Sequence, residues 1–287
     1  MPAPLLFVLS GVTQYVGAAV AVGLFAVLPP ANVAWLRVVV AALLLAGWTR
    51  AWRTRALWTW SALRTAAAFG VVLALMNAAF YVAIDSLPLG TAVALEFAGP
   101  VAVAAVTGTG WRDRLSIVVA AAGVVLLAGV SLNLGQDAAR GLVAIGVAAA
   151  CWALYIVLGR RVATARTGGL TGLGVAMAVG SLALAPFLAP GAAPVLADAR
   201  LALLVVVVAF CSSVVPYGIE QVVLRRVRPA TFAVLLALLP ATATLVGAAL
   251  LGQVPHGLEV VGLVLVSGAI ALSARTEDAH EEAPPPS

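Results

Sequence analysis

Ten long runs of apolar residues, separated by short stretches that contain proline, glycine or charge, constrain this chain more than any other feature. A helix that crosses the hydrocarbon core of a bilayer needs about 20 residues, and only helices and closed barrels satisfy every backbone polar group there. The runs are too long and continuous for barrel strands, so the sequence predicts an all-α membrane protein with ten transmembrane helices. The runs cover about Leu5–Leu28, Val33–Trp48, Leu63–Ile84, Leu89–Thr107, Leu115–Leu132, Gly141–Leu158, Leu170–Leu188, Leu201–Leu224, Ala230–Leu251 and Leu258–Ser273.

The composition agrees with these spans. Only 9% of the 287 residues are charged, whereas a soluble domain carries roughly 25%. This excludes a soluble globular protein, a disordered chain, a disulfide scaffold and a nucleic-acid-binding protein with a basic face. The spans leave only short connections and no room for a soluble domain.

The arginines predict the orientation. All 16 basic residues are Arg, and most fall in alternate connections. Cytoplasmic loops carry the excess of basic residues, so we expect both termini in the cytoplasm and the chain in the inner or plasma membrane, in contact with lipid. One side carries Arg50, Arg53, Arg55, Arg64, Arg112, Arg114, Arg160, Arg161, Arg166, Arg225, Arg226, Arg228 and Arg275, and the other only Arg140 and Arg200.

The chain resembles itself when shifted by 140 residues. Pro100 then falls on Pro240, and Leu95 falls on Leu235. This predicts two repeats, 1–137 and 138–276, and the odd number of spans in each inverts the second relative to the first. Inverted repeats are typical of secondary transporters, whose site lies at the midplane between the halves; the alternative is chance similarity between two Ala/Val/Leu-rich stretches. The acidic, proline-containing segment 277–287 is predicted to be a disordered cytoplasmic tail.

Several polar residues lie inside the apolar runs, where they are costly and therefore face a cavity or a partner. Glu96 lies four residues before Pro100, which cannot donate to its carbonyl, so we expect a bend there. The other candidates for substrate binding are Arg37, Asn77, Tyr81, Tyr217, Glu220, Gln14 and Tyr155.

The chemistry of these side chains suits a small zwitterion. A carboxyl group in a low-dielectric environment can exchange a proton or bind an ammonium, Arg can bind a carboxylate through two hydrogen bonds, and the neutral groups supply further hydrogen bonds. A phosphate-bearing solute fits poorly because only one cation lies inside a span. We expect no metal and no cofactor: His256 and His280 fall outside the spans, and the thiols of Cys151 and Cys211 fall in apolar runs.

Each candidate also has a purely structural interpretation. Glu96 would then be protonated and hydrogen-bonded between helices, Arg37 would extend to the outer interface, and Tyr81 and Tyr217 would be packing residues. Glu220 would pair with Arg225 or Arg226.

The segment Met76–Pro100 closely resembles the threonine/homoserine exporters of the EamA-type drug/metabolite transporter superfamily. Shorter similar stretches are Leu36-Arg37, Ala150–Ile156 and Val215–Glu220, and the similarity runs from about Gln14 to Ser273. The resemblance implies ten helices in two inverted repeats. It also implies an inner-membrane exporter of threonine-like amino acids, driven by proton antiport.

Two positions depart from the family pattern. Leu239 and Gln253 stand where the family usually has glutamates, so proton coupling would depend more on Glu96 and Glu220. Our hypothesis is a secondary exporter of small amino acids by alternating access, and not an enzyme. The alternatives are an exporter of hydrophobic or drug-like metabolites, a passive channel, and an intramembrane enzyme or sensor; the oligomeric state is left open.

Overall fold

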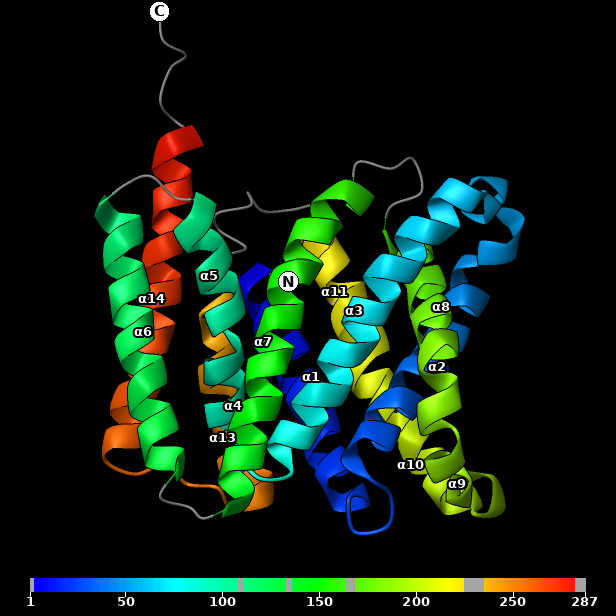
Figure 1. Ribbon diagram of the computed structural model, residues 1–287, viewed down its shortest axis with the longest axis horizontal. Helices are drawn as coiled ribbons and strands as arrows, with labels where there is room; N and C mark the ends of the chain where they lie inside the picture. Colours follow the sequence, from blue (N-terminus) through cyan, green and yellow to red (C-terminus); the bar gives the residue numbers. More distant parts are fainter. Residues whose placement is uncertain (1–2, 108–110, 133–135, 164–168, 225–234, 282–287) are drawn as a thin grey trace, which may run out of the picture.

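The computed structural model describes residues 3–107, 111–132, 136–163, 169–224 and 235–281, which form a bundle of helices joined by short connections (Figure 1). Seven stretches are long and apolar enough to cross a membrane. These are α1 (Ala3–Leu24), α2 (Pro30–Thr49), α3 (Trp60–Ile84), α6 (Trp111–Leu132), α7 (Gln136–Ala163), α8 (Leu170–Leu188), and α10 (Ala199–Ala209), which continues through the π-helical turn η4 (Phe210–Val214) into α11 (Val215–Leu224).

Shorter apolar helices complete the bundle. They are α4 (Leu89–Glu96) with α5 (Ala98–Thr107), α13 (Leu238–Leu251) and α14 (Leu258–Glu281), whose apolar part ends at Leu272. Short helical turns lie in the connections: η1 (Ala51–Arg53), η2 (Arg55–Trp58), η3 (Pro190–Ala192) and α9 (Pro194–Ala197). The prediction of an all-α membrane protein is confirmed. The start of the ninth predicted run lies outside the described residues.

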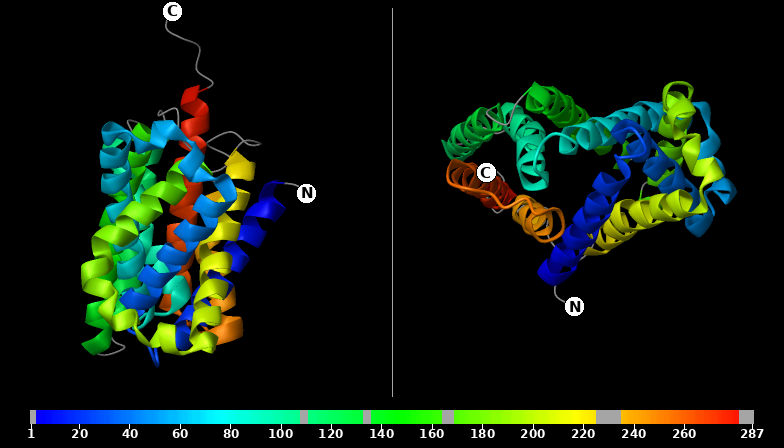
Figure 2. Two further views of the ribbon diagram at one scale, coloured as in Figure 1. Left: turned by 90° about the vertical axis from the view of Figure 1, so that its right-hand side faces the viewer. Right: turned by 90° about the horizontal axis from the view of Figure 1, so that it is seen from below.

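The long helices run side by side, and their direction alternates along the chain (Figures 1 and 2). The C-terminal ends of α2, α5, α7, α11 and α14 therefore lie at one end of the bundle, and the start of α1 lies towards the same end (Figure 2). The arginine-rich stretches follow or adjoin these ends, as an alternating up-and-down chain requires.

The C-terminal segment differs from our expectation. The sequence predicts disorder from residue 277, but α14 continues as a helix to Glu281. The residues from Arg275 to Glu281 include no proline or glycine, and the first proline comes at Pro284, so charge alone does not end the helix. Residues 282–287 lie outside the described part of the chain.

The helix that begins at Leu89 is interrupted, as Pro100 predicts. α4 ends at Glu96, Phe97 forms a turn, and α5 begins at Ala98. A proline removes the hydrogen bond to the carbonyl four residues earlier and its ring crowds that carbonyl. The same interruption occurs at Ala237, three residues before Pro240, just as Phe97 is three residues before Pro100.

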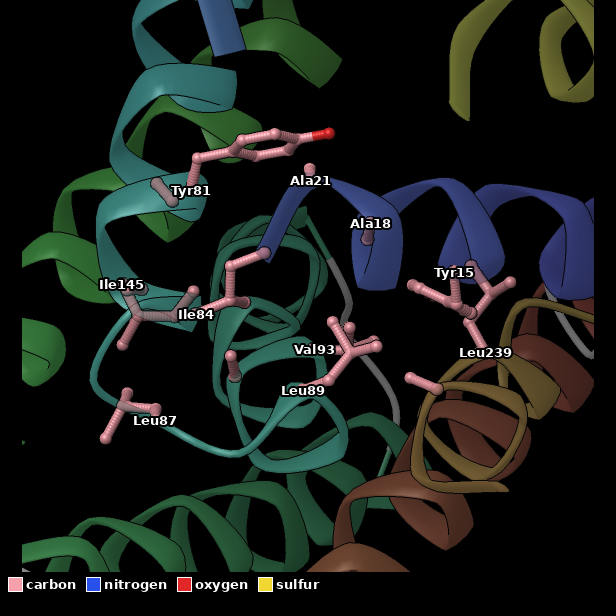
Figure 3. Close-up of a cluster of buried hydrophobic side chains, with 14 of the residues drawn as sticks. Tyr15, Ala18, Ala21, Tyr81, Ile84, Leu87, Leu89, Val93, Ile145 and Leu239 are labelled. Carbon is pink, nitrogen blue, oxygen red and sulfur yellow. The ribbon is translucent and has the colours of Figure 1, made fainter. Parts of the chain in front are cut away.

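Small residues bring helix backbones into close contact. The backbones of α3 and α8 meet at Gly70 and Gly180, and those of α6 and α14 meet near Gly123 and Gly262. Interfaces between membrane helices are rich in small residues because these permit such contacts. α1 packs mainly against α13 and the α10–α11 helix, and its Ala21 lies beside Tyr81 of α3 (Figure 3).

Candidate functional site

Arg37, on α2, is directed into the protein. Its side chain is only 5% exposed. Its Nη1 donates a hydrogen bond of 3.2 Å to the hydroxyl of Tyr81 on α3, and its guanidinium carbon lies 4.9 Å from the centre of the Tyr81 ring. The interpretation in which Arg37 extends to the outer interface is therefore wrong.

Tyr81 fixes this arginine from a position deep in the core. Its side chain is completely buried, beside Ala21 of α1 (Figure 3), and its ring also meets Phe25 edge-on, with centroids 5.9 Å apart. A charge-assisted hydrogen bond and a cation–π contact both act on the same guanidinium. Tyr81 therefore orients Arg37, a role that its spacing from Asn77 alone does not indicate.

The guanidinium of Arg37 retains an unused donor. Within the described residues its Nε is buried and has no hydrogen-bond partner. A buried donor without a partner loses the hydrogen bonds that water would supply, at a cost of about 1–3 kcal/mol and more for a charged group. An anionic ligand would satisfy this donor.

Glu96 is brought near Arg37 by the fold. It is the half-buried last residue of α4, and its carboxyl interacts electrostatically with Arg37 of α2. The buried thiol of Cys151, on α7, lies within the influence of the same carboxyl. A cation and an acid from separate helices thus share one region of the protein interior, which no spacing in the sequence indicates.

Asn77 and Tyr81 share one face of α3, as their spacing predicts, and both are buried. The Asn77 amide, however, donates to the carbonyl of Leu73 at 2.8 Å, one turn earlier in its own helix. Part of its hydrogen-bonding capacity is therefore used locally.

The remaining candidates are distributed more widely. Gln14 is half-buried on α1, and its backbone carbonyl accepts a hydrogen bond of 2.8 Å from Ser212. Tyr155 and Tyr217 both pack against an apolar cluster formed by α2, α3, α8 and η4, where the ring of Tyr155 lies 4.5 Å from that of Phe69. Both tyrosines contribute to packing, which for Tyr217 is the structural interpretation given above.

Glu220 lies on α11, but its side chain is outside the described part of the structure. Its proposed role in the site and its alternative pairing with Arg225 or Arg226 both stay predictions.

A second set of polar contacts holds the first turn of α4. The backbone N–H of Leu89 donates to Oε1 of Gln253 at 2.9 Å, and the Thr91 hydroxyl donates to the carboxylate of Glu259. The first N–H groups of a helix have no partner within the helix, so Gln253 supplies one from the α13–α14 connection. The sequence marks Gln253 as a departure from the family pattern, but Glu259 was not identified from the sequence as a residue of this region.

The described residues contain no group of three or more His, Cys, Asp and Glu side chains placed to hold a metal ion.

Comparisons with known proteins give consistent results. Residues 139–275 match the EamA-like transporter family. The chain is 34% identical over 262 residues to the threonine/homoserine exporter RhtA of Salmonella typhimurium (strain LT2), an alignment that covers 88% of this chain and 84% of the relative. It is 33% identical over 278 residues to the threonine/homoserine exporter RhtA of Escherichia coli (strain K12), covering 93% and 90%.

The fold also resembles that of a solved protein. A crystal structure described only as "Crystal structure of protein" superposes with a TM-score of 0.61 over 96% of this chain and 99% of that one, at 17% identity. At this identity the likeness concerns the fold alone.

Proposed function

The chain belongs to the EamA-like transporter family, and we propose that it is an inner-membrane secondary transporter that exports small amino acids of the threonine or homoserine type by alternating access. The relatives it matches over most of their length are named as exporters of these amino acids. The structural observation that carries the proposal is the buried Arg37, whose Nε is unsatisfied and which lies within electrostatic reach of the Glu96 carboxyl. Together these two groups complement a zwitterion.

The proposal includes ten transmembrane helices in two inverted halves, 1–137 and 138–276. The helix interruptions at Phe97 and Ala237 support it, because the shift of 140 residues relates them. The family match at 139–275 covers nearly the same stretch as the second half.

Helix contacts support the same symmetry. If α1 corresponds to α7, α2 to α8, α3 to the α10–α11 helix, α5 to α13 and α6 to α14, then contacts should occur in equivalent pairs. They do. The contact of α1 with α11 is equivalent to that of α7 with α3, and the contact of α1 with α13 to that of α7 with α5. The contact of α2 with α10 is equivalent to that of α8 with α3. Exchanging the two halves maps the pair α2–α8 onto itself, and likewise the pair α6–α14. Contacts across a two-fold axis behave in this way.

We place the arginine-rich end of the bundle, with both termini, in the cytoplasm, following the positive-inside rule.

In this mechanism Arg37 binds the substrate carboxylate through its free donors while Tyr81 holds the guanidinium in place. Glu96 binds the substrate ammonium or a proton, but not both, because a carboxyl group in a low-dielectric interior needs one positive partner. Exchange of a proton for the ammonium would couple export to proton entry. The cavity would be completed by Asn77, Gln14, Tyr155, Tyr217 and Glu220.

The test is transport of labelled threonine and homoserine by proteoliposomes under an imposed pH gradient. Glu96→Gln, which keeps the shape of the side chain but cannot ionise, should abolish transport driven by the gradient. Asp137→Asn, which removes an exposed acid at the start of α7, is the matched control and should behave as wild type. Unchanged transport by Glu96→Gln would remove Glu96 from the mechanism, and flux that ignores the gradient in wild type would favour a channel.

One observation favours the alternative cargo, a hydrophobic or drug-like metabolite. Leu239, which replaces an acid usual in the family, is buried against an apolar cluster that includes Tyr15 of α1 (Figure 3). Resistance profiles of expressing cells against amino-acid analogues and toxic organic cations would separate the two substrate classes.

A further inference from the structure

The helix formed by α10 and α11 is distorted at its centre. Residues Phe210–Val214 adopt a π-helical turn directly before α11, which carries Pro216 near its start. Proline prevents the ordinary hydrogen bond to the carbonyl of Ser212, and one π-helical turn accommodates the defect. Such turns occur frequently at functional sites.

This turn leaves one serine hydroxyl without a partner. Five hydroxyl or amide side chains elsewhere in the helices donate to the carbonyl four residues earlier at 2.7–2.8 Å. The pairs are Thr49 with Leu45, Asn77 with Leu73, Ser181 with Met177, Thr242 with Leu238 and Thr244 with Pro240. Ser213 is fully buried, yet its hydroxyl makes no hydrogen bond to any described residue. In the part of the chain that the structure describes, Ser213 Oγ and Arg37 Nε are the two buried side-chain polar atoms that have no hydrogen-bond partner.

The two unsatisfied groups lie at the same junction of helices. The π-helical turn contacts both α1 and α2. On one side Ser212 bonds to Gln14 of α1, and on the other Val214 joins the apolar cluster that contains Val38, the neighbour of Arg37 on α2. Ser213 comes between these two contacts and faces the bundle interior, since its side chain is fully buried.

α1 connects the two groups along its length. Gly17 packs so closely on the π-helical turn that a Cβ there would lie 3.1 Å from the Ser212 nitrogen. Ala21, one helical turn further along, lies beside Tyr81, the partner of Arg37 (Figure 3). One turn of helix rises about 5.4 Å, which is comparable with the length of a small amino acid.

We propose that Ser213 determines specificity: its hydroxyl binds the side-chain hydroxyl of the transported amino acid, while Arg37 binds the carboxylate. This inference rests on the proposed function and adds the selection of hydroxylated over apolar substrates. A serine hydroxyl can both donate and accept, so it pairs with a substrate hydroxyl and is left unpaired by a methyl group. A site built in this way discriminates strongly against the analogue that lacks the hydroxyl.

In the conformation described, the hydroxyl is enclosed. Substrate can therefore reach it only when helices that surround the π-helical turn, such as α1 or α2, separate from it.

The experiment compares two substrates in proteoliposomes: L-threonine and L-2-aminobutyrate, which is the same molecule without the hydroxyl. Wild type should prefer threonine. Ser213→Ala should weaken the apparent affinity for threonine by about 10-fold, the size expected for one neutral hydrogen bond, and leave that for 2-aminobutyrate unchanged. Ser212→Ala, the matched control, removes a bond within the protein and should affect both substrates equally.

A second variant guards against misfolding. Ser213→Cys keeps a small side chain of similar shape but hydrogen-bonds weakly, so it should reduce the preference in the same direction; size-exclusion profiles confirm that each variant is folded. An equal change for both substrates in the Ser213 variants, or no change in either, overturns the inference. If wild type transports both amino acids without preference, only the role of Ser213 fails, whereas transport of neither would overturn the proposed function and this inference with it.

Discussion

Gly70 provides a direct test of how α3 and α8 pack. A Cβ at this position would lie 2.7 Å from the carbonyl carbon of Ala176 and 3.0 Å from the nitrogen of Gly180, and closer still to the Ala176 oxygen. Ordinary contacts of this kind are about 3.5–4.0 Å. All three atoms belong to the backbone of α8, so no side chain can rotate away and the two helices must separate.

The expected cost of Gly70→Ala follows from two opposing effects. Overpacking costs roughly 1–3 kcal/mol, and the backbone contact places Gly70 at the upper end of that range. Alanine gains back up to about 1 kcal/mol from its higher helix propensity. The net destabilisation of about 2 kcal/mol corresponds to a fall in Tm of roughly 4–8 °C for a chain of this size.

The assay is thermal unfolding of purified protein in detergent, followed by a thiol-reactive dye or by size-exclusion chromatography. Gly146→Ala is the matched control, since Gly146 lies inside α7 with no atoms near its would-be Cβ. Its Tm should stay the same or rise. Equal Tm changes in both variants would refute the close approach of α3 and α8.

Two further predictions concern polar contacts. Tyr81→Phe keeps the ring beside Arg37 but removes the hydroxyl acceptor. We expect the apparent affinity for threonine to fall roughly 10- to 100-fold, the range for one hydrogen bond to a charged group, and an unchanged affinity in counterflow assays would contradict the orienting role. Gln253→Glu retains an oxygen that can accept from the Leu89 N–H and should leave Tm nearly unchanged. Gln253→Ala should lower Tm by a few degrees, since loss of a helix N-cap costs about 1 kcal/mol. Equal Tm values for these two variants would disprove the capping role.

Much of the fold follows from the sequence because the bilayer imposes simple rules. Long apolar runs must be helical, and each described run is. Pro100 predicts the interruption of its helix for a reason that involves only its own ring and missing N–H. The buried positions of Arg37, Asn77 and Tyr81 also follow from the high cost of exposing polar groups to lipid.

The pairings within the site could not be predicted in this way. The bond from Arg37 to Tyr81 and the proximity of Arg37 to Glu96 depend on how separate helices pack, and no local spacing encodes that packing. The π-helical turn that isolates Ser213 also escapes a periodicity analysis, because a single extra residue in a turn leaves the apolar pattern almost unchanged.

The interruption at Phe97 divides one membrane-crossing segment into two short rods with different attachments. The first rod, α4, contacts α13 and α14 and is bonded to Gln253 and Glu259, and both rods pack on α6 and α7. The polar contacts of Gln253 and Glu259 hold only the first rod, and Glu96 lies at the junction between the two. If the protein works by the proposed alternating access, a carboxyl at this junction can stay nearly in place while the two short helices move, and can then face opposite sides of the membrane in succession.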